Sequence, residues 1–351
     1  MSLAPQVKEL GDKVELIVSD NCSPDDTPQV VEEAQKWCPI RYNRNPENLG
    51  AARNGDKLVY ELARGEFLWV IGDDDIVRPD GVVRIVNVLE THPDVDYVFV
   101  NTSPRLSAAR HAFARPVTGA DFPDLLPAKG KSLEDRAVDR WEDLVDPKVD
   151  EIFLGSLMCA VHRLSRMKQY RFELGPEKEP FSMLEYSYPV SQAYTMVGRK
   201  AYYIGYPCTI AFWGDQKWMR YRPLLVLVRL QELLDLYLRV GVPVSNVEKC
   251  RSYLLDHSTR YLKEMLLDKQ TPGRRYFSLG RFIWRNRRHP FRLGSKFGKV
   301  WFGLPEWPDV KNAMSDLLPL WRRRFGRLVR DPLGLCRSAI RRLSSRAAEP
   351  R

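Results

Sequence analysis

The sequence lacks a hydrophobic run long enough to cross a bilayer as a helix. Its best candidate, residues 222–238, is interrupted by Arg229, Glu232 and Asp235 and is predicted to be an amphipathic helix. The chain does not open with the apolar core of a signal peptide. Its six cysteines include no CxxC pair, and its five histidines have no metal-ligand spacing. These absences argue against a zinc site or a disulfide framework and favour a reducing cytosol.

Charge is concentrated at one end of the chain. From residue 271 onward there are 20 Lys and Arg against 5 Asp and Glu, whereas the first 270 residues carry 35 against 40. The overall net charge of +10 is therefore a property of the C-terminal segment. Aromatic and basic residues alternate there, which favours an anionic membrane surface as the partner. A solvated basic tail is the alternative, and no nucleic-acid motif accompanies the charge.

Strands and helices alternate over the first hundred residues. Apolar, β-branched runs predict strands at 14–20, 40–45, 66–72 and 95–101, and helix signals predict helices at 28–37, 48–65 and 79–93. Further on, 200–215 is predicted as a strand followed by a loop, and two helices are expected from 222 to about 268. This alternation predicts an α/β fold with a mostly parallel sheet, in which ligands bind at the carboxyl ends of the strands.

Three carboxylates, Asp73, Asp74 and Asp75, directly follow the strand predicted at 66–72. Like charges this close repel unless a cation lies among them. Hard divalent cations select carboxylate oxygens, often together with substrate phosphates. We therefore predict Mg²⁺ or Mn²⁺ bound to a diphosphate. A solvated acidic turn and the nucleophile loop of haloacid-dehalogenase phosphatases are alternatives, although the latter's second acidic loop has no counterpart here.

The first hundred residues resemble the inverting family 2 glycosyltransferases of the GT-A fold. The resemblance rests on "VELIVSDNCSPDDT", "NPENLGAARN" and "GEFLWVIGDDDIVRPDGV", in the family's order and at its spacing. The Gly-Asp-Asp-Asp form is similar to the abequosyltransferase-like subgroup, which decorates bacterial surface polysaccharides. The resemblance implies a nucleotide-sugar donor and a divalent metal. A nucleotidyltransferase of similar fold is a distant alternative. Such enzymes are expected to have a glycine-rich phosphate loop near their start, and this sequence does not show one.

The resemblance also implies roles for the residues of the first two motifs. Asp20 would accept a hydrogen bond from the nucleotide base, with a turn or helix cap as its structural alternative. Asn21, Asn48 and Gly50 would shape the loop beside the nucleotide. Arg53 would face the diphosphate, unless it is an ordinary surface arginine.

In the third motif, Asp73 and Asp74 would lie at the ribose and the metal, and Asp75 at the metal. The family's Asp-x-Asp usually starts one residue earlier, where this chain has Gly72. A carboxylate base would deprotonate the acceptor hydroxyl. Glu185, in an aromatic-rich stretch, is the preferred candidate, and Asp215 is the second.

The chain departs from the family pattern at its N-terminus. "SLAPQV" resembles the end of the family's first helix, so that the first strand and its nucleotide contacts are not represented. We expect such a chain to fold less well than a longer form. The same departure motivates an alternative function, a non-catalytic glycosyltransferase remnant that binds membrane or partner enzymes.

Three regions follow from these observations. Residues 1–220 are predicted to form the GT-A domain, 221–270 a helical extension, and 271–351 a basic, amphipathic, membrane-associating tail. The acceptor would be a bacterial cell-surface glycan or a polyprenyl-linked glycan, and the enzyme would lie at the cytoplasmic face of the membrane.

Overall fold

The computed structural model describes residues 2–106, 109, 121–122, 128–170, 187–214 and 217–302. Its N-terminal part contains a parallel strand pair, β1 (Leu16–Asp20) with β2 (Ile40–Arg44). Three helices accompany this pair: α1 (Ala4–Leu10), α2 (Thr27–Gln35) and α3 (Ala51–Lys57), the last continued by a π-helical turn, Leu58–Leu62. The buried Gln6 side chain joins α1 to the following layer, because it donates to the Arg78 carbonyl and accepts from the Val82 backbone N–H.

A six-stranded mixed sheet follows, with β3, β7, β5, β8 and β4 in that order and β6 also paired with β8. Its strands are β3 (Phe67–Trp69), β4 (Ile76–Val77), β5 (Tyr97–Leu106), β6 (Arg136–Val138), β7 (Ala160–Arg163) and β8 (Ala201–Trp213). The two long strands, β5 and β8, are parallel to each other, whereas β3, β4 and β6 each pair with an antiparallel neighbour.

Strand β5 forms the centre of the core because its side chains alternate between two apolar layers. Tyr97 and Phe99 face a large cluster that includes residues of helices α6 (Ser187–Met196) and α8 (Leu230–Val240). Val98 and Val100 face a second cluster with Ile85 and other residues of helix α4 (Gly81–Thr91). All four of these β5 side chains are fully buried. The sheet is therefore covered by helices on both faces.

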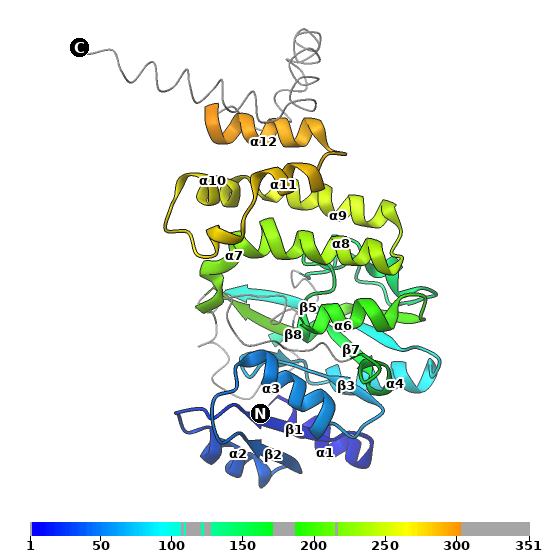
Figure 1. Cartoon of the computed structure of the whole chain (residues 1–351). Helices are drawn as coiled ribbons and strands as arrows, with labels where there is room; N and C mark the ends of the chain where they lie inside the picture. The colour runs from blue at the N-terminus through cyan, green and yellow to red at the C-terminus, as the bar shows by residue number, and fades with distance from the viewer. Residues whose placement is uncertain are drawn as a thin grey trace, which may run out of the picture.

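Helices continue beyond the sheet. After α7 (Arg222–Leu224) and a π-helical turn, Leu225–Arg229, the chain forms α8, α9 (Val244–His257), α10 (Thr259–Leu267), α11 (Leu279–Arg285) and α12 (Pro290–Phe302). Figure 1 shows these helices stacked above the sheet, with β1 and β2 on the opposite side. None of the helices in the described residues is long and apolar enough to span a bilayer.

The predicted α/β class is confirmed, but the sheet is mixed rather than mostly parallel. Within the stretch 200–215, residues Ala201–Trp213 are strand throughout, and the region expected to hold two helices contains α7 to α10. Among the described residues, β1 pairs only with β2, and β3 pairs only with β7. No described strand therefore joins the two sheets. The reduced stability expected from an absent first strand stays a prediction.

Candidate functional site

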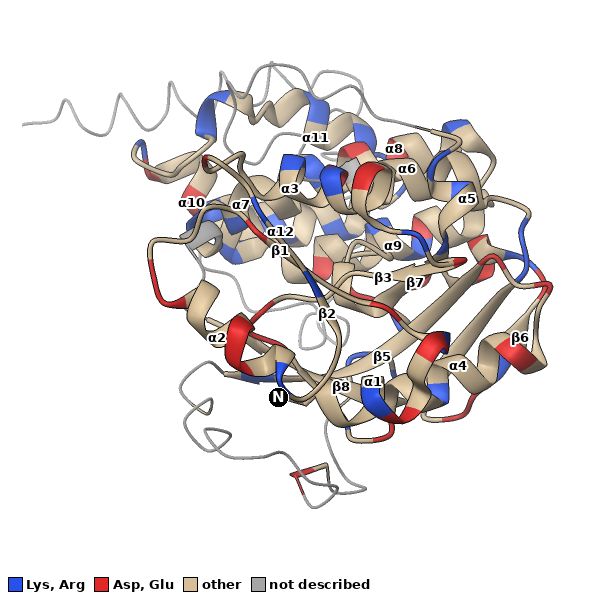
Figure 2. Cartoon of the chain, turned by 90° about the horizontal axis from the view of Figure 1, so that it is seen from below, with Lys and Arg blue, Asp and Glu red and all other residues tan. Residues whose placement is uncertain are grey.

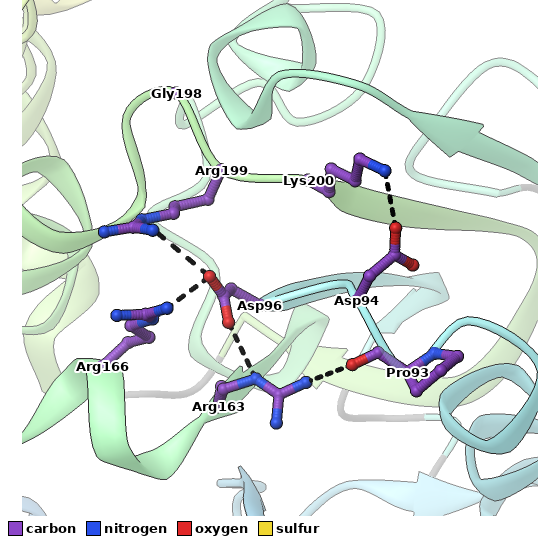
Figure 3. A pocket seen from close by; sticks show the side chains of 8 residues that line it. All are labelled: Pro93, Asp94, Asp96, Arg163, Arg166, Gly198, Arg199 and Lys200. Atoms are coloured by element: carbon purple, nitrogen blue, oxygen red, sulfur yellow. Dashed lines mark hydrogen bonds and ion pairs between the residues drawn. The ribbon is translucent and has the colours of Figure 1, made fainter.

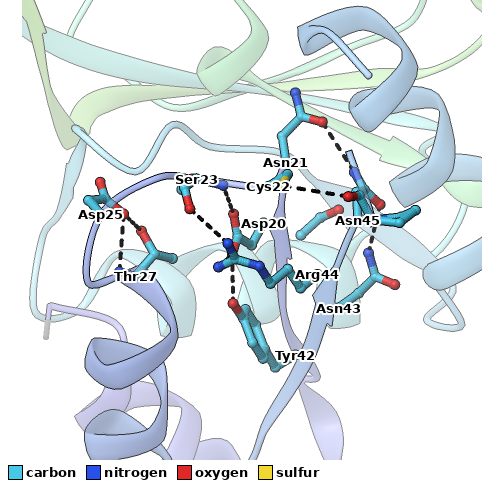
Figure 4. Close-up of polar contacts among 12 residues, drawn as sticks. Asp20, Asn21, Cys22, Ser23, Asp25, Thr27, Tyr42, Asn43, Arg44 and Asn45 are labelled. Carbon is cyan, nitrogen blue, oxygen red and sulfur yellow. Dashed lines mark hydrogen bonds and ion pairs between the residues drawn. The ribbon is translucent and has the colours of Figure 1, made fainter. Parts of the chain in front are cut away.

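The loop after β1 is organised around the carboxylate of Asp20, whose side chain is completely buried. One oxygen accepts the Ser23 backbone N–H at 2.7 Å, and the other accepts the Tyr42 hydroxyl at 2.7 Å and the Arg44 guanidinium at 2.8 Å (Figure 4). Burial opposes ionisation, but these hydrogen bonds and the Arg44 charge outweigh it and lower the pKa of Asp20. Asp20 therefore remains an anion that fixes the loop.

Asn21 joins this loop to the start of α3. Its Nδ2 donates to Asn48 Oδ1 at 2.9 Å, and its Oδ1 accepts the Leu49 backbone N–H at 2.8 Å. Asn48 Oδ1 also accepts the Gly50 N–H at 2.9 Å. Gly50 has φ of +79°, a conformation that glycine adopts without a Cβ penalty. The structure thus brings together three of the residues that the sequence placed beside the nucleotide.

Two further asparagines belong to this network and were not assigned roles from the sequence. Asn54 accepts the Ser19 hydroxyl at 2.7 Å and donates to the Ser19 carbonyl at 3.0 Å. Asn45 is 1% exposed, donates to both Asn21 and Asn54, and accepts Lys57 Nζ at 2.9 Å. Both lie within the "NPENLGAARN" motif, and this position is the sequence feature that could have identified them.

Arg53 lies on the third position of α3 and is exposed. The side chains around it, Asn54 and Lys57, point back into the asparagine network rather than outward. Contact of Arg53 with a diphosphate stays a prediction.

The acidic triplet follows β3, where the chain turns into β4. A Cβ placed on Gly72 would lie 2.6 Å from Asp74 Oδ1 and 3.3 Å from Asp75 Oδ2. The two carboxylate oxygens thus occupy the space that a side chain at position 72 would fill, and they lie no more than about 6 Å apart. A larger side chain at position 72 would therefore have to displace the ends of these two side chains.

Asp75 is the most perturbed of the three acids. Burial, followed by the charges of Asp74 and Asp73, raises the pKa of Asp75 to about 7, although the backbone N–H groups of Gly72 and Phe212 donate to it. The hydrogen bond from Phe212 places Asp75 at the carboxyl end of β8. Two of the strand ends at this edge, those of β3 and β8, therefore meet at the triplet.

The convergence of Asp74 and Asp75 fits a divalent cation that takes its remaining ligands from a substrate and water. Mg²⁺ is commonly bound by one or two carboxylates plus substrate phosphates. No group of three or more His, Cys, Asp or Glu side chains within the described residues could hold a metal ion by itself. Metal binding by Asp74 and Asp75 stays a prediction.

The two candidate catalytic bases, Glu185 and Asp215, lie outside the described residues. The nearest described segments are α6, which begins at Ser187, and the end of β8 at Trp213. Trp213 is 40% exposed and is paired in register with Leu106, which is 56% exposed. An exposed apolar pair thus adjoins the β8 residue that donates to Asp75.

Comparison with known proteins gives one family and two partial relatives. Residues 2–120 match the family model described as "Glycosyl transferase family 2". The chain is 33% identical over 84 residues to the abequosyltransferase RfbV of Salmonella typhimurium, which is 23% of this chain and 25% of that protein. It is 28% identical over 85 residues, 24% of this chain, to an uncharacterized glycosyltransferase of Haemophilus influenzae. The chain thus spans about a quarter of the length of these relatives.

Among solved structures, TarS residues 1–349 of S. aureus with UDP gives a TM-score of 0.43 at 16% identity, covering 84% of this chain and 86% of that one. The mannosyltransferase PcManGT of Pyrobaculum calidifontis with GDP-Man and Mn²⁺ gives 0.39 at 14% identity, covering 86% and 85%. These values are too low to carry an argument about this chain. The family match covers Asp20, Asn21, Asn48 and Gly50 and the acidic triplet. Residues 2–120 are therefore the part of the chain that is similar to glycosyltransferase family 2.

Proposed function

We propose that the chain is a metal-dependent, inverting glycosyltransferase that uses a nucleotide-sugar donor. The observation that carries the proposal is the convergence of Asp74 and Asp75 over Gly72, at the end of β3 and inside the segment that matches the family 2 model. A side chain at position 72 would have to displace the Asp74 carboxylate and press on that of Asp75, which supports a role for Gly72 in placing them.

In this proposal Asp74 and Asp75 hold Mg²⁺ or Mn²⁺, and Asp73 lies toward the ribose. The bound cation would supply charge stabilisation to the diphosphate leaving group. Arg53, exposed at the start of α3, would add a guanidinium on the same diphosphate. Glu185, or else Asp215, would take the proton from the acceptor hydroxyl as that oxygen displaces the diphosphate from the sugar.

For the loop that follows β1, we propose that Asp20 does not contact the nucleotide directly. Its side chain is fully buried and three donors already point at its oxygens, so its contribution is to hold the loop in shape. Asn21 and Asn48 are the polar side chains of this loop that lie nearer the surface. They are our candidates for contact with the nucleotide.

We further propose that α11 and α12 rest on an anionic membrane surface, which gives access to a polyprenyl-linked or cell-surface glycan acceptor at the cytoplasmic face. Phe282 packs inward against the helical layer, whereas Trp284 is 60% exposed and Phe291 is 57% exposed. The Arg287 guanidinium lies over the Trp284 ring at 4.2 Å. Figure 2 shows Lys and Arg along α11. Exposed aromatics next to arginines suit the membrane interface.

Vesicle flotation tests the membrane proposal. We expect the full chain to float with vesicles of phosphatidylcholine and phosphatidylglycerol, and the double variant Trp284→Ser/Phe291→Ser to float much less. Trp37→Ser is the matched control, because Trp37 is 59% exposed but follows α2. Flotation with pure phosphatidylcholine alone, or equal loss in the control, would contradict the proposal.

A thermal-shift panel of UDP, GDP, CDP and TDP, each with and without Mn²⁺, tests the enzymatic proposal. A ligand present at 100 times its dissociation constant adds about 2.7 kcal/mol to the free energy of unfolding, which is readily detected. We expect at least one nucleotide to stabilise the protein only when Mn²⁺ is present. If none does, the alternative of a non-catalytic protein that binds membrane or partner enzymes is favoured.

A further inference from the structure

A hollow of about 450 Å³ lies at the opposite end of the sheet from the acidic triplet. Figure 3 shows the residues that line it. Phe67, the first residue of β3, pairs with Arg163 in the wall of this hollow, whereas the triplet follows the last residue of β3. Along β8 the hollow adjoins Ala201 and the triplet adjoins Phe212, which are roughly 35 Å apart at about 3.3 Å per residue. The hollow is therefore distinct from the proposed donor site.

The framework of this hollow is a buried ion pair. Asp96 precedes β5, and Arg163 Nε donates to Asp96 Oδ1 at 2.7 Å. Arg163 Nη2 donates to the carbonyls of Pro93 and Val95 at 2.7 and 2.9 Å, and Nη1 bonds to Glu66. All three side-chain nitrogens of Arg163 therefore donate within the protein, and this arginine serves the fold.

Arg166 and Arg199 are held differently. Each directs Nε toward the same Asp96 oxygen, Oδ2, at 3.2 Å for Arg166 and 3.9 Å for Arg199. In the parts of the chain that the structure describes, no hydrogen bond or ion pair is formed by their Nη atoms. Their side chains are 29% and 44% exposed. Two guanidinium groups are thus held side by side by one carboxylate oxygen, with their outer donors facing solvent.

The hollow also has an excess of positive charge. Three arginines and Lys200 line it, against the carboxylates of Asp94 and Asp96. Lys200 is paired with Asp94 at 2.6 Å, and Asp96 is shared among the three arginines. Arg163 is also paired with Glu66, so four cations face three carboxylates. The single positive charge that is left over is shared by Arg166 and Arg199.

We propose that this hollow binds a phosphate group between Arg166 and Arg199. Planar guanidinium groups form paired hydrogen bonds with phosphate oxygens, and two adjacent arginines match a doubly charged phosphomonoester. The hollow is open to solvent, which leaves room for a further group on the phosphate. A small phosphorylated metabolite and a lipid headgroup share this chemistry.

Calorimetry with glycerol 3-phosphate, in buffer that contains EDTA, tests the proposal on the full chain. EDTA removes divalent ions and so suppresses phosphate binding at the acidic triplet. We expect the wild type to bind and Arg166→Gln/Arg199→Gln to bind about tenfold more weakly or less, because charge-assisted hydrogen bonds are lost. The control is Lys36→Gln/Arg260→Gln, which removes two charges from exposed ion pairs elsewhere.

Vesicles distinguish the two sources of phosphate. Flotation with phosphatidic acid in phosphatidylcholine is compared with phosphatidylglycerol at equal surface charge. A preference of the wild type for phosphatidic acid that the double variant loses indicates a lipid headgroup, and glycerol 3-phosphate binding without that preference indicates a free ligand. Absence of both, or equal loss in the control, overturns the proposal. If the double variant unfolds, Arg199→Gln alone gives the same test, because its ion pair is the longest of the three.

Discussion

At one end of the six-stranded sheet three carboxylates follow one another, and at the other end one carboxylate lies among three arginines. Asp75 is crowded by Asp74 and Asp73, and its pKa is raised to about 7. Asp96 is bonded to Arg163 and Arg166 and lies 3.9 Å from Arg199. The fold places acidic residues near the carboxyl ends of β3 and β8, and basic residues near the amino ends of the same strands.

The difference between the two ends lies in how the charge is balanced. At the basic end the protein supplies the opposite charge itself through Asp96, Glu66 and backbone carbonyls, so the excess is small. At the acidic end Asp74 and Asp75 share the space above Gly72. We therefore expect the acidic end to depend strongly on a bound cation, and the basic end to contribute to stability whether or not a ligand is bound.

The largest expected effect is at the acidic end. Asp75→Asn should lower sugar transfer, or donor hydrolysis, on the order of 10²- to 10³-fold, because it removes a charged ligand that acts where negative charge develops. Its unfolding midpoint should not fall, since one of three crowded like charges is removed. Activity with Mn²⁺ and urea unfolding measure the two quantities. Full activity, or loss of activity through unfolding, would contradict this role.

The matching substitution at the basic end should act on stability instead. Asp96→Asn is expected to lower the free energy of unfolding by about 3 kcal/mol, because it leaves the largely buried Arg163 with the exposed Glu66 as its remaining carboxylate partner. Asp94→Asn is the control. Both side chains of the Asp94–Lys200 ion pair are exposed, so the pair should contribute little to the free energy of unfolding. Urea unfolding of the two variants compares them. Equal stabilities would show that Asp96 is not the framework residue.

A smaller effect concerns His162 in β7, which is completely buried and bonded to the Tyr188 hydroxyl at 2.8 Å. Burial lowers the pKa of His162 to about 3, below the value of about 6.5 in the unfolded chain. The unfolded state therefore binds the proton more readily, and stability is lost as the pH falls below 6.5. We expect a loss of about 2 kcal/mol between pH 6.5 and pH 5.

Urea unfolding at several pH values measures this loss in the wild type and in His162→Phe, which cannot titrate. The variant should be less stable at neutral pH but should depend less on pH. Tyr188→Phe keeps the histidine and removes only the hydrogen bond, so it should retain the wild-type pH dependence. Identical pH profiles for the wild type and His162→Phe would show that His162 is not the titrating group.

The smallest change tests the position of the carboxylates. Gly72→Ala should weaken Mn²⁺ binding about tenfold, or about 1.4 kcal/mol, because its Cβ would displace Asp74 and Asp75. Gly280→Ala in α11 is the control, since a Cβ there meets nothing within 4 Å. If Gly72→Ala binds Mn²⁺ as the wild type does, the acids are not confined above Gly72.

Much of the first hundred residues could be predicted from the sequence. The strands at 14–20, 40–45, 66–72 and 95–101 contain β1, β2, β3 and the start of β5, because their apolar runs are bounded by clear turn residues. The helix at 48–65 was harder, since its last turn, Leu58–Leu62, is π-helical. Strand β5 runs on to Leu106, past Pro104. Among the described strands, β7 pairs only with the first three residues of β5, so the N–H that Pro104 lacks is not needed for a bond to β7.

The parts of the sites that depend on distant residues could not be predicted. The motif spacing located the triplet and the nucleotide loop, but burial of Asp20 depends on Tyr42 and Arg44, one strand away. The basic hollow combines the loop before β5, the end of β7 and the turn before β8, and these are adjacent only in the folded sheet. The three regions predicted at 1–220, 221–270 and 271–351 stay a prediction.

The most direct measurement is calorimetric titration of Mn²⁺ and of the nucleoside diphosphate selected by the thermal-shift panel, each in the absence and presence of the other. If Asp74 and Asp75 hold the cation against the diphosphate, each ligand should tighten the binding of the other by the same factor, and Asp75→Asn should abolish this coupling. Independent binding of the two ligands, or coupling that survives in Asp75→Asn, would contradict the account.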